Sequence, residues 1–132
     1  MGRCLGAYRG CPDQRYDNLL TIGAIPAAGV RVADLKATIL KHLEALKTEP
    51  VGGDELSAAI ARLDASRDAL YAADFPLALA IVRHHVALGD WKTVLRTGEE
   101  CRTVTAAEVM AFARKYFTPE NRTVVTLLAG PR

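Results

Sequence analysis

The sequence predicts an α+β fold, with strands near the two ends of the chain and helices between them. Apolar residues recur at helical spacing through the middle of the 132 residues. A compact apolar run precedes this region, and a β-branched run follows it. Because a sheet of only two strands is marginal in water, we expect residues 1–132 to be a single partial domain whose other strands lie elsewhere.

Two main strands are expected, and a short one is expected before them within an irregular start. Residues 1–18 are rich in Gly, Arg, Asp and Cys and should be an irregular start with a short strand near Leu5–Tyr8. The run Leu19–Ala24 predicts a buried strand, because a proline and a glycine close it. The run Arg122–Leu128 is β-branched and apolar and predicts the last strand.

Helices are predicted between these strands from apolar spacing and from residues that begin or end helices. Asp74 is a candidate N-cap, Gly89 is a C-terminal stop, and Thr105 with Glu108 forms a T-x-x-E capping box. The expected helices are Val32–Lys47, Asp54–Tyr71, Asp74–Leu88, a segment of one or two turns at Asp90–Arg96, and a last helix opened by Thr105 and ended by Thr118-Pro119.

The composition is that of a globular protein and excludes some classes of partner. Half the residues are hydrophobic, and 17 basic against 15 acidic residues give a net charge of +2, which argues against a nucleic-acid binder. No apolar run predicts a membrane span or a signal peptide, so the sequence leaves the compartment open between cytoplasm and periplasm. The odd number of cysteines (Cys4, Cys11 and Cys101) favours unpaired thiols in a reducing compartment.

The histidines do not predict a metal site. His42, His84 and His85 fall in no H-x-x-E-H motif or its inverse. Adjacent residues on a helix point about 100° apart, so His84 and His85 would not share a metal on one face. We expect structural or solvated roles for all three.

The sequence also predicts no catalytic nucleophile and no cofactor. Ser57 and Ser66 lie within a predicted helix, and Cys101 lies in a polar connection without an obvious histidine base. The glycines match no phosphate-binding loop.

Four segments form an ordered set of motifs. They are P-V followed by D-E-L at residues 50–56, L-G-D-W at 88–91, V-T-A-A-E-V at 104–109, and A-R-K-Y-F-T-P-E-N-R at 113–122. Taken in this order, they resemble segments of the pitrilysin/insulinase-like zinc metallopeptidases, which include the mitochondrial processing peptidases. The resemblance covers about residues 18–130.

The resemblance implies an architecture and a division of labour. Domains of this family have several helices packed on one face of a small, mostly antiparallel sheet. A catalytic domain binds zinc with H-x-x-E-H, and a partner domain closes over the peptide substrate. The resemblance therefore implies that this chain is the C-terminal part of a non-catalytic domain. It would not be an enzyme by itself, and zinc would be held only by a catalytic domain or subunit.

Tyr8 is the one substrate-binding residue that the resemblance implies. The family's partner domain often carries an arginine and, seven residues later, a tyrosine that contact the substrate carbonyl and its oxyanion. Leu5-Gly6-Ala7-Tyr8 is similar to the end of that motif, but Met1 stands at the arginine position. Arg3 or Arg9 would replace it at a different spacing, and Tyr16 is the weaker candidate tyrosine. Ordinary packing is an equal alternative for Tyr8.

Three functional hypotheses follow. The first is a non-catalytic fragment or subunit of a zinc metallopeptidase that contributes to substrate clamping and assembly. The second is a purely structural member of the same family, comparable to the core subunits of the respiratory bc1 complex. The third is a helical adaptor outside the family. An exposed sheet edge also predicts homo-oligomers when the chain is isolated, and we expect no nucleic acid or membrane as partner.

Overall fold

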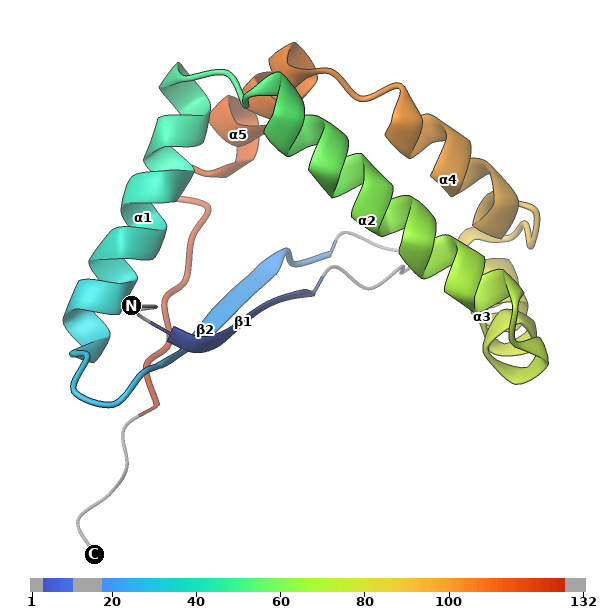
Figure 1. Ribbon diagram of the computed structural model, residues 1–132, viewed down its shortest axis with the longest axis horizontal. Coiled ribbons are helices and arrows are strands. Elements are labelled where there is room, and N and C mark those ends of the chain that lie inside the picture. The colour runs from blue at the N-terminus through green and yellow to red at the C-terminus, as the bar shows by residue number, and fades with distance from the viewer. Residues whose placement is uncertain (1–3, 11–17, 128–132) are drawn as a thin grey trace, which may run out of the picture. The chain divides into compact units, whose positions relative to one another are not determined.

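The computed structural model describes residues 4–10 and 18–127, and within these ranges it contains two strands and five helices (Figure 1). The predicted α+β class is therefore confirmed. The chain divides into two compact units. One contains α1 and nearly all of α5, and the other contains α2, α3 and α4.

The two strands form an antiparallel pair (Figure 1). Strand β1 is Cys4–Gly10 and contains the short strand predicted near Leu5–Tyr8. Strand β2 is Thr21–Pro26, so it begins two residues later than predicted. The prediction that it is buried was wrong, since Ile22 and Ile25 are both exposed. The physical reason is that β1 is its only neighbour among the described residues.

The predicted last strand is also absent over the described residues 122–127, and Leu128 lies outside them. This segment is β-branched, but a strand is stable only when a neighbouring strand accepts its backbone hydrogen bonds. Its apolar side chains Val124, Val125 and Leu127 are exposed. Composition therefore identified residues suited to a strand, but it did not reveal whether a neighbouring strand is available to pair with them.

Helices α1 and α5 are joined at their C-terminal ends. Helix α1 is Val32–Thr48, as predicted to within one residue, and α5 is Ala106–Tyr116. The Lys47 ammonium donates to the carbonyl of Phe117 at 3.0 Å, and Arg114 Nε donates to the carbonyl of Lys47 at 2.7 Å. Both acceptors lie at helix ends, where carbonyls have no partner within the helix.

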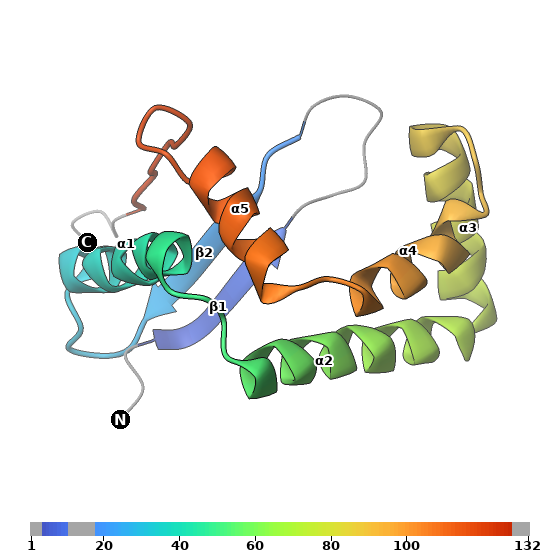
Figure 2. The same cartoon turned by 90° about the horizontal axis from the view of Figure 1, so that it is seen from above.

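Helices α2 (Gly53–Tyr71), α3 (Asp74–Leu88) and α4 (Thr93–Arg102) contact one another in the second unit (Figure 2). The Tyr71 hydroxyl donates to the carbonyl of Val94 at 3.2 Å and so ties the end of α2 to the start of α4. The side chain of Val94 is buried beside this contact. No helix within the described ranges is both long and apolar enough to cross a membrane.

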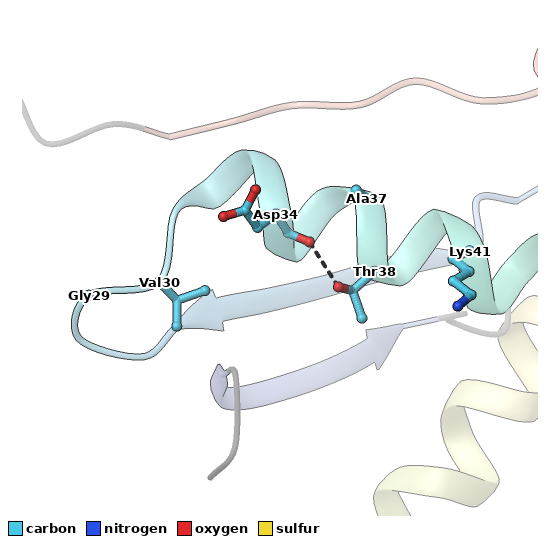
Figure 3. A pocket seen from close by; sticks show the side chains of 6 residues that line it. All are labelled: Gly29, Val30, Asp34, Ala37, Thr38 and Lys41. Atoms are coloured by element: carbon cyan, nitrogen blue, oxygen red, sulfur yellow. Dashed lines mark hydrogen bonds between the residues drawn. The ribbon is translucent and has the colours of Figure 1, made fainter.

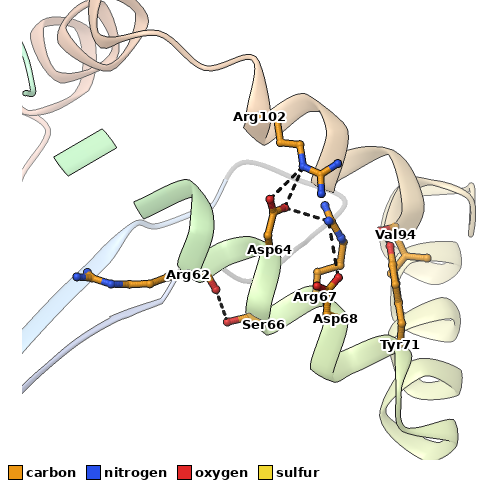
Figure 4. Close-up of polar contacts among 8 residues, drawn as sticks. All are labelled: Arg62, Asp64, Ser66, Arg67, Asp68, Tyr71, Val94 and Arg102. Atoms are coloured by element: carbon orange, nitrogen blue, oxygen red, sulfur yellow. Dashed lines mark hydrogen bonds and ion pairs between the residues drawn. The ribbon is translucent and has the colours of Figure 1, made fainter. Parts of the chain in front are cut away.

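Helix α4 is longer than the predicted one or two turns, and Cys101 lies in it rather than in a polar connection. Two contacts with α2 explain the extension (Figure 4). Arg102 Nε donates to both carboxylate oxygens of Asp64, at 3.0 and 3.2 Å, and this interaction raises the pKa of Arg102. The side chain of Arg67 occupies the space that a Cβ atom on Gly98 would fill.

Helix α2 begins at Gly53, one residue before the predicted start. Helix α3 begins at Asp74 as predicted, but Asp74 is its first helical residue rather than its N-cap. Ala73 holds the N-cap position without a side-chain hydrogen bond. An acidic residue in the first turn still interacts favourably with the positive end of the helix dipole. Asp74 therefore stabilises the start of α3 in this way and not as its N-cap.

Candidate functional site

Tyr8 lies in β1, and its ring covers Gly23 in β2. A Cβ atom built on Gly23 would overlap the end of the Tyr8 ring and would lie 2.7 Å from Cε1. The absence of a side chain at Gly23 therefore lets the ring lie against the neighbouring backbone. Tyr8 nevertheless remains 61% exposed, so the residue packs across the strand pair and is still accessible from solvent.

The other candidates for this motif fall outside the described part of the molecule. Arg3 and Tyr16 lie in undescribed segments, and Arg9 lies in β1 with its side chain undescribed. The substrate-binding role of Tyr8 and the identity of a partner arginine stay predictions. The sequence contained a signal for the contact that the structure adds, because a glycine inside a strand often marks a close approach.

The Tyr8–Gly23 contact predicts an asymmetric response to substitution in the strand pair. Gly23→Val should displace the Tyr8 ring and lower the free energy of unfolding by about 1 kcal/mol or more, as overpacking does. Gly6→Val is the matched control, because no atom lies within 4 Å of the position of its added Cβ. Ring resonances of Tyr8 in NMR spectra and urea unfolding measure the two effects. Equal behaviour of the two variants would contradict the contact.

The L-G-D-W segment has a structural role at the turn between α3 and α4. Gly89 has φ 78°, a left-handed conformation that glycine adopts without a steric penalty. The Asp90 carboxylate accepts a hydrogen bond from the backbone N–H of Lys92 at 2.9 Å and one from Arg96 at 2.8 Å. These contacts turn the chain and begin α4.

The A-R-K-Y-F-T-P-E-N-R segment is likewise structural. It supplies Arg114, which contacts the end of α1, and Asn121, whose side-chain amide donates to the carbonyl of Tyr116 at 3.0 Å. The backbone N–H of Asn121 donates to the Thr118 hydroxyl at 3.3 Å. Hydrogen bonds from its own backbone N–H and from Thr118 lower the pKa of Glu120. Two of the segments that carry the resemblance thus end helices and hold turns.

The histidine positions give no metal centre among the described residues. No group of three potential ligands gathers within these ranges. His84 Nδ1 lies 2.9 Å from the Thr93 hydroxyl oxygen, and that hydroxyl donates to the carbonyl of Asp90 at 2.6 Å. Since the hydroxyl has one hydrogen, His84 Nδ1 is the donor to Thr93. This hydrogen bond joins α3 to the start of α4. The described residues therefore do not fit a zinc site.

An open hollow of about 490 Å³ lies beside the first half of α1 (Figure 3). Asp34 and Lys41 contribute opposite charges to it, and the Thr38 hydroxyl donates to the carbonyl of Asp34 at 2.9 Å. The residues that line it include no nucleophile paired with a base. We therefore assign no chemistry to this hollow. Its lining residues are Gly29, Val30, Asp34, Ala37, Thr38 and Lys41.

The fold is similar to those of two solved zinc-protease structures, so the resemblance is confirmed at the level of the fold. The inactive peptidase domain of a predicted zinc protease from Bordetella parapertussis matches it with a TM-score of 0.77 and 23% identity. That match covers 98% of this chain and 70% of the other.

A predicted zinc protease from Bordetella pertussis Tohama I matches with a TM-score of 0.74 and 24% identity, over 92% of this chain and 66% of the other. No protein-family model matches the chain, and no curated protein matches it. Because the matches cover 70% and 66% of the two solved chains, about a third of each has no counterpart in this chain.

Proposed function

We propose that this chain is a non-catalytic part of a zinc metallopeptidase, which assembles with a catalytic H-x-x-E-H domain or subunit and helps to hold the peptide substrate. The observation that carries the proposal is the match to an inactive peptidase domain over 98% of the chain. In this proposal the partner supplies zinc and the water-activating glutamate, and this chain supplies part of the surface that holds the peptide.

The strand pair supports the assembly role. Two strands alone are marginal in water, and the apolar side chains of Ile22 and Ile25 are exposed on β2. Val125 is exposed in the segment that has strand composition but no strand partner within residues 4–10 and 18–127. Further strands from the same protein or from a partner would pair with the free edge and cover these side chains.

Tyr8 is the residue that we propose contacts the peptide. Its ring is held over Gly23 and remains largely exposed, and a tyrosine hydroxyl can donate a hydrogen bond to a substrate carbonyl. A donor directed at the developing oxyanion would stabilise the transition state more than the bound substrate.

Reconstitution tests the proposal. The purified chain is mixed with any H-x-x-E-H subunit whose gene is found beside its own, and hydrolysis of a fluorogenic peptide mixture is measured together with the size of the complex. We expect a complex whose activity exceeds that of the catalytic subunit alone. A complex without any gain in activity would favour the purely structural role, and the absence of a complex would contradict both roles.

The Tyr8→Phe variant separates substrate contact from packing. It keeps the ring over Gly23 and removes only the hydroxyl, so complex formation should be unchanged. If the hydroxyl stabilises the oxyanion, kcat of the reconstituted peptidase should fall by about a hundredfold to a thousandfold. An unchanged kcat would leave Tyr8 with its packing role alone.

A further inference from the structure

Helix α3 carries apolar residues around its whole circumference. Its inner residues, which include Leu77, Ile81 and Ala87, are half-buried in the unit that it forms with α2 and α4. A helix that is apolar on all sides is normally covered on all sides. The opposite face of α3 is nevertheless exposed, and it is defined by Phe75, Leu79, Val82 and Val86.

These four residues, here called the α3 stripe, form one continuous line along the helix. Their spacing of four, three and four residues is the pattern of a helix that pairs with a second helix. The two ends of the line are the most exposed, with Phe75 at 78% and Val86 at 72%. Arg83 and His85 follow Val82 and flank the line on its two sides, which is where polar residues border a helix pair.

The two ends of the α3 stripe are complementary in shape. Phe75 projects at the N-terminal end, whereas a hollow of about 250 Å³ lies at the C-terminal end. In an antiparallel pair of identical helices, each N-terminal end meets the C-terminal end of the other copy. The Phe75 ring of each copy would then enter the hollow of the other copy. The hollow is lined by Ile81, Val82, His85, Val86 and Trp91.

Hydrogen-bonding side chains are complementary in the same arrangement. Asp74 precedes Phe75 and His85 precedes Val86, so both pairs are separated by the same eleven residues. Eleven residues are about three helical turns, which places Asp74 and His85 on the same side of the α3 stripe. The antiparallel pairing that joins Phe75 to Val86 also brings each Asp74 carboxylate beside the other copy's His85, and it opposes the two helix dipoles.

We infer that the α3 stripe is the contact surface of a homodimer, in which two copies of α3 pack antiparallel around a twofold axis near Leu79 and Val82. A second copy is favoured over another partner because α3 carries both halves of each contact. Phe75 and the hollow that would receive it lie on the same helix, as do Asp74 and His85. An interface made by one helix and Trp91 is at the small end of specific interfaces, so the dimer should form reversibly in the micromolar range.

Sedimentation velocity of the full chain over low-micromolar to millimolar concentrations tests this inference. The wild type should pass from monomer to dimer, and Val82→Asp should remain monomeric with an unchanged far-UV circular dichroism spectrum. Leu63→Asp, which alters an exposed apolar residue of α2, should dimerise like the wild type. A wild type that stays monomeric throughout would overturn the inference, as would a dimer that Leu63→Asp abolishes and Val82→Asp preserves.

A charge exchange tests the antiparallel direction. Asp74→Lys should weaken the dimer, because it places a lysine beside His85 of the other copy. Asp74→Lys combined with His85→Glu should restore the affinity, since it rebuilds the pair with reversed charges. If the double variant dimerises no better than Asp74→Lys, the two helices do not pair in this direction. This experiment needs no catalytic subunit, so its failure is distinguishable from a failure of the proposed peptidase role.

Discussion

Replacing Val94 with aspartate is expected to unfold the helical unit formed by α2, α3 and α4. Val94 is 6% exposed and is the one buried apolar residue of α4. Its backbone carbonyl accepts the hydrogen bond from Tyr71, so the side chain lies where α2 and α4 meet. A carboxylate placed there loses its hydration without gaining a cationic partner, which costs several kcal/mol in folded proteins.

Leu95→Asp is the matched control for this substitution. It introduces the same charge one residue further along α4, but Leu95 is 48% exposed. Its free energy of unfolding should change by only about 0.5 kcal/mol, as is usual for surface positions. Far-UV circular dichroism during urea titration measures both variants. Comparable losses of stability in the two would show that α4 packs with a different face from the one described.

Ala113→Leu is expected to have the second-largest effect, and it acts in the other unit. Ala113 is 1% exposed, and it precedes Arg114, whose side chain reaches the last turn of α1. Added methyl groups at a filled position force neighbouring side chains or backbone to shift, which costs about 1–3 kcal/mol. The larger side chain should also disturb the hydrogen bond between Arg114 Nε and the Lys47 carbonyl.

Ala111→Leu provides the comparison for this variant. It makes the same change in the same helix, but Ala111 is exposed. Leucine and alanine differ little in helix propensity, so its unfolding midpoint in urea should be close to that of the wild type. A destabilisation by Ala111→Leu as large as that by Ala113→Leu would contradict the assignment of Ala113 to the core.

The helices were predictable because their signals are local. Apolar spacing located α1, α2 and α3 to within one residue at each end, and Gly89 marked the end of α3 as expected for a glycine with positive φ. The length of α4 was not predictable from its neighbours in sequence. Its second half depends on contacts with Asp64 and Arg67 from a distant part of the chain.

The strands were less predictable than the helices. The residues around β2 and the run that follows α5 both have strand composition, yet only β2 is a strand. Strand formation depends on a neighbouring strand, and composition does not reveal whether one is available. Tyr8 was named from the sequence as a candidate substrate-binding residue, and that role stays a prediction. Its contact with Gly23 joins residues of two strands, so it became visible only in the fold.

Zinc stoichiometry tests the central claim most directly. The metal content of the purified chain, of an H-x-x-E-H subunit and of their complex is measured together with peptide hydrolysis by each. We expect no stoichiometric zinc and no hydrolysis for this chain alone. We expect one zinc per complex, carried by the catalytic subunit, with activity that increases when the two are mixed. One zinc per molecule of the isolated chain, with hydrolysis that a chelator abolishes, would contradict the claim that this chain is non-catalytic.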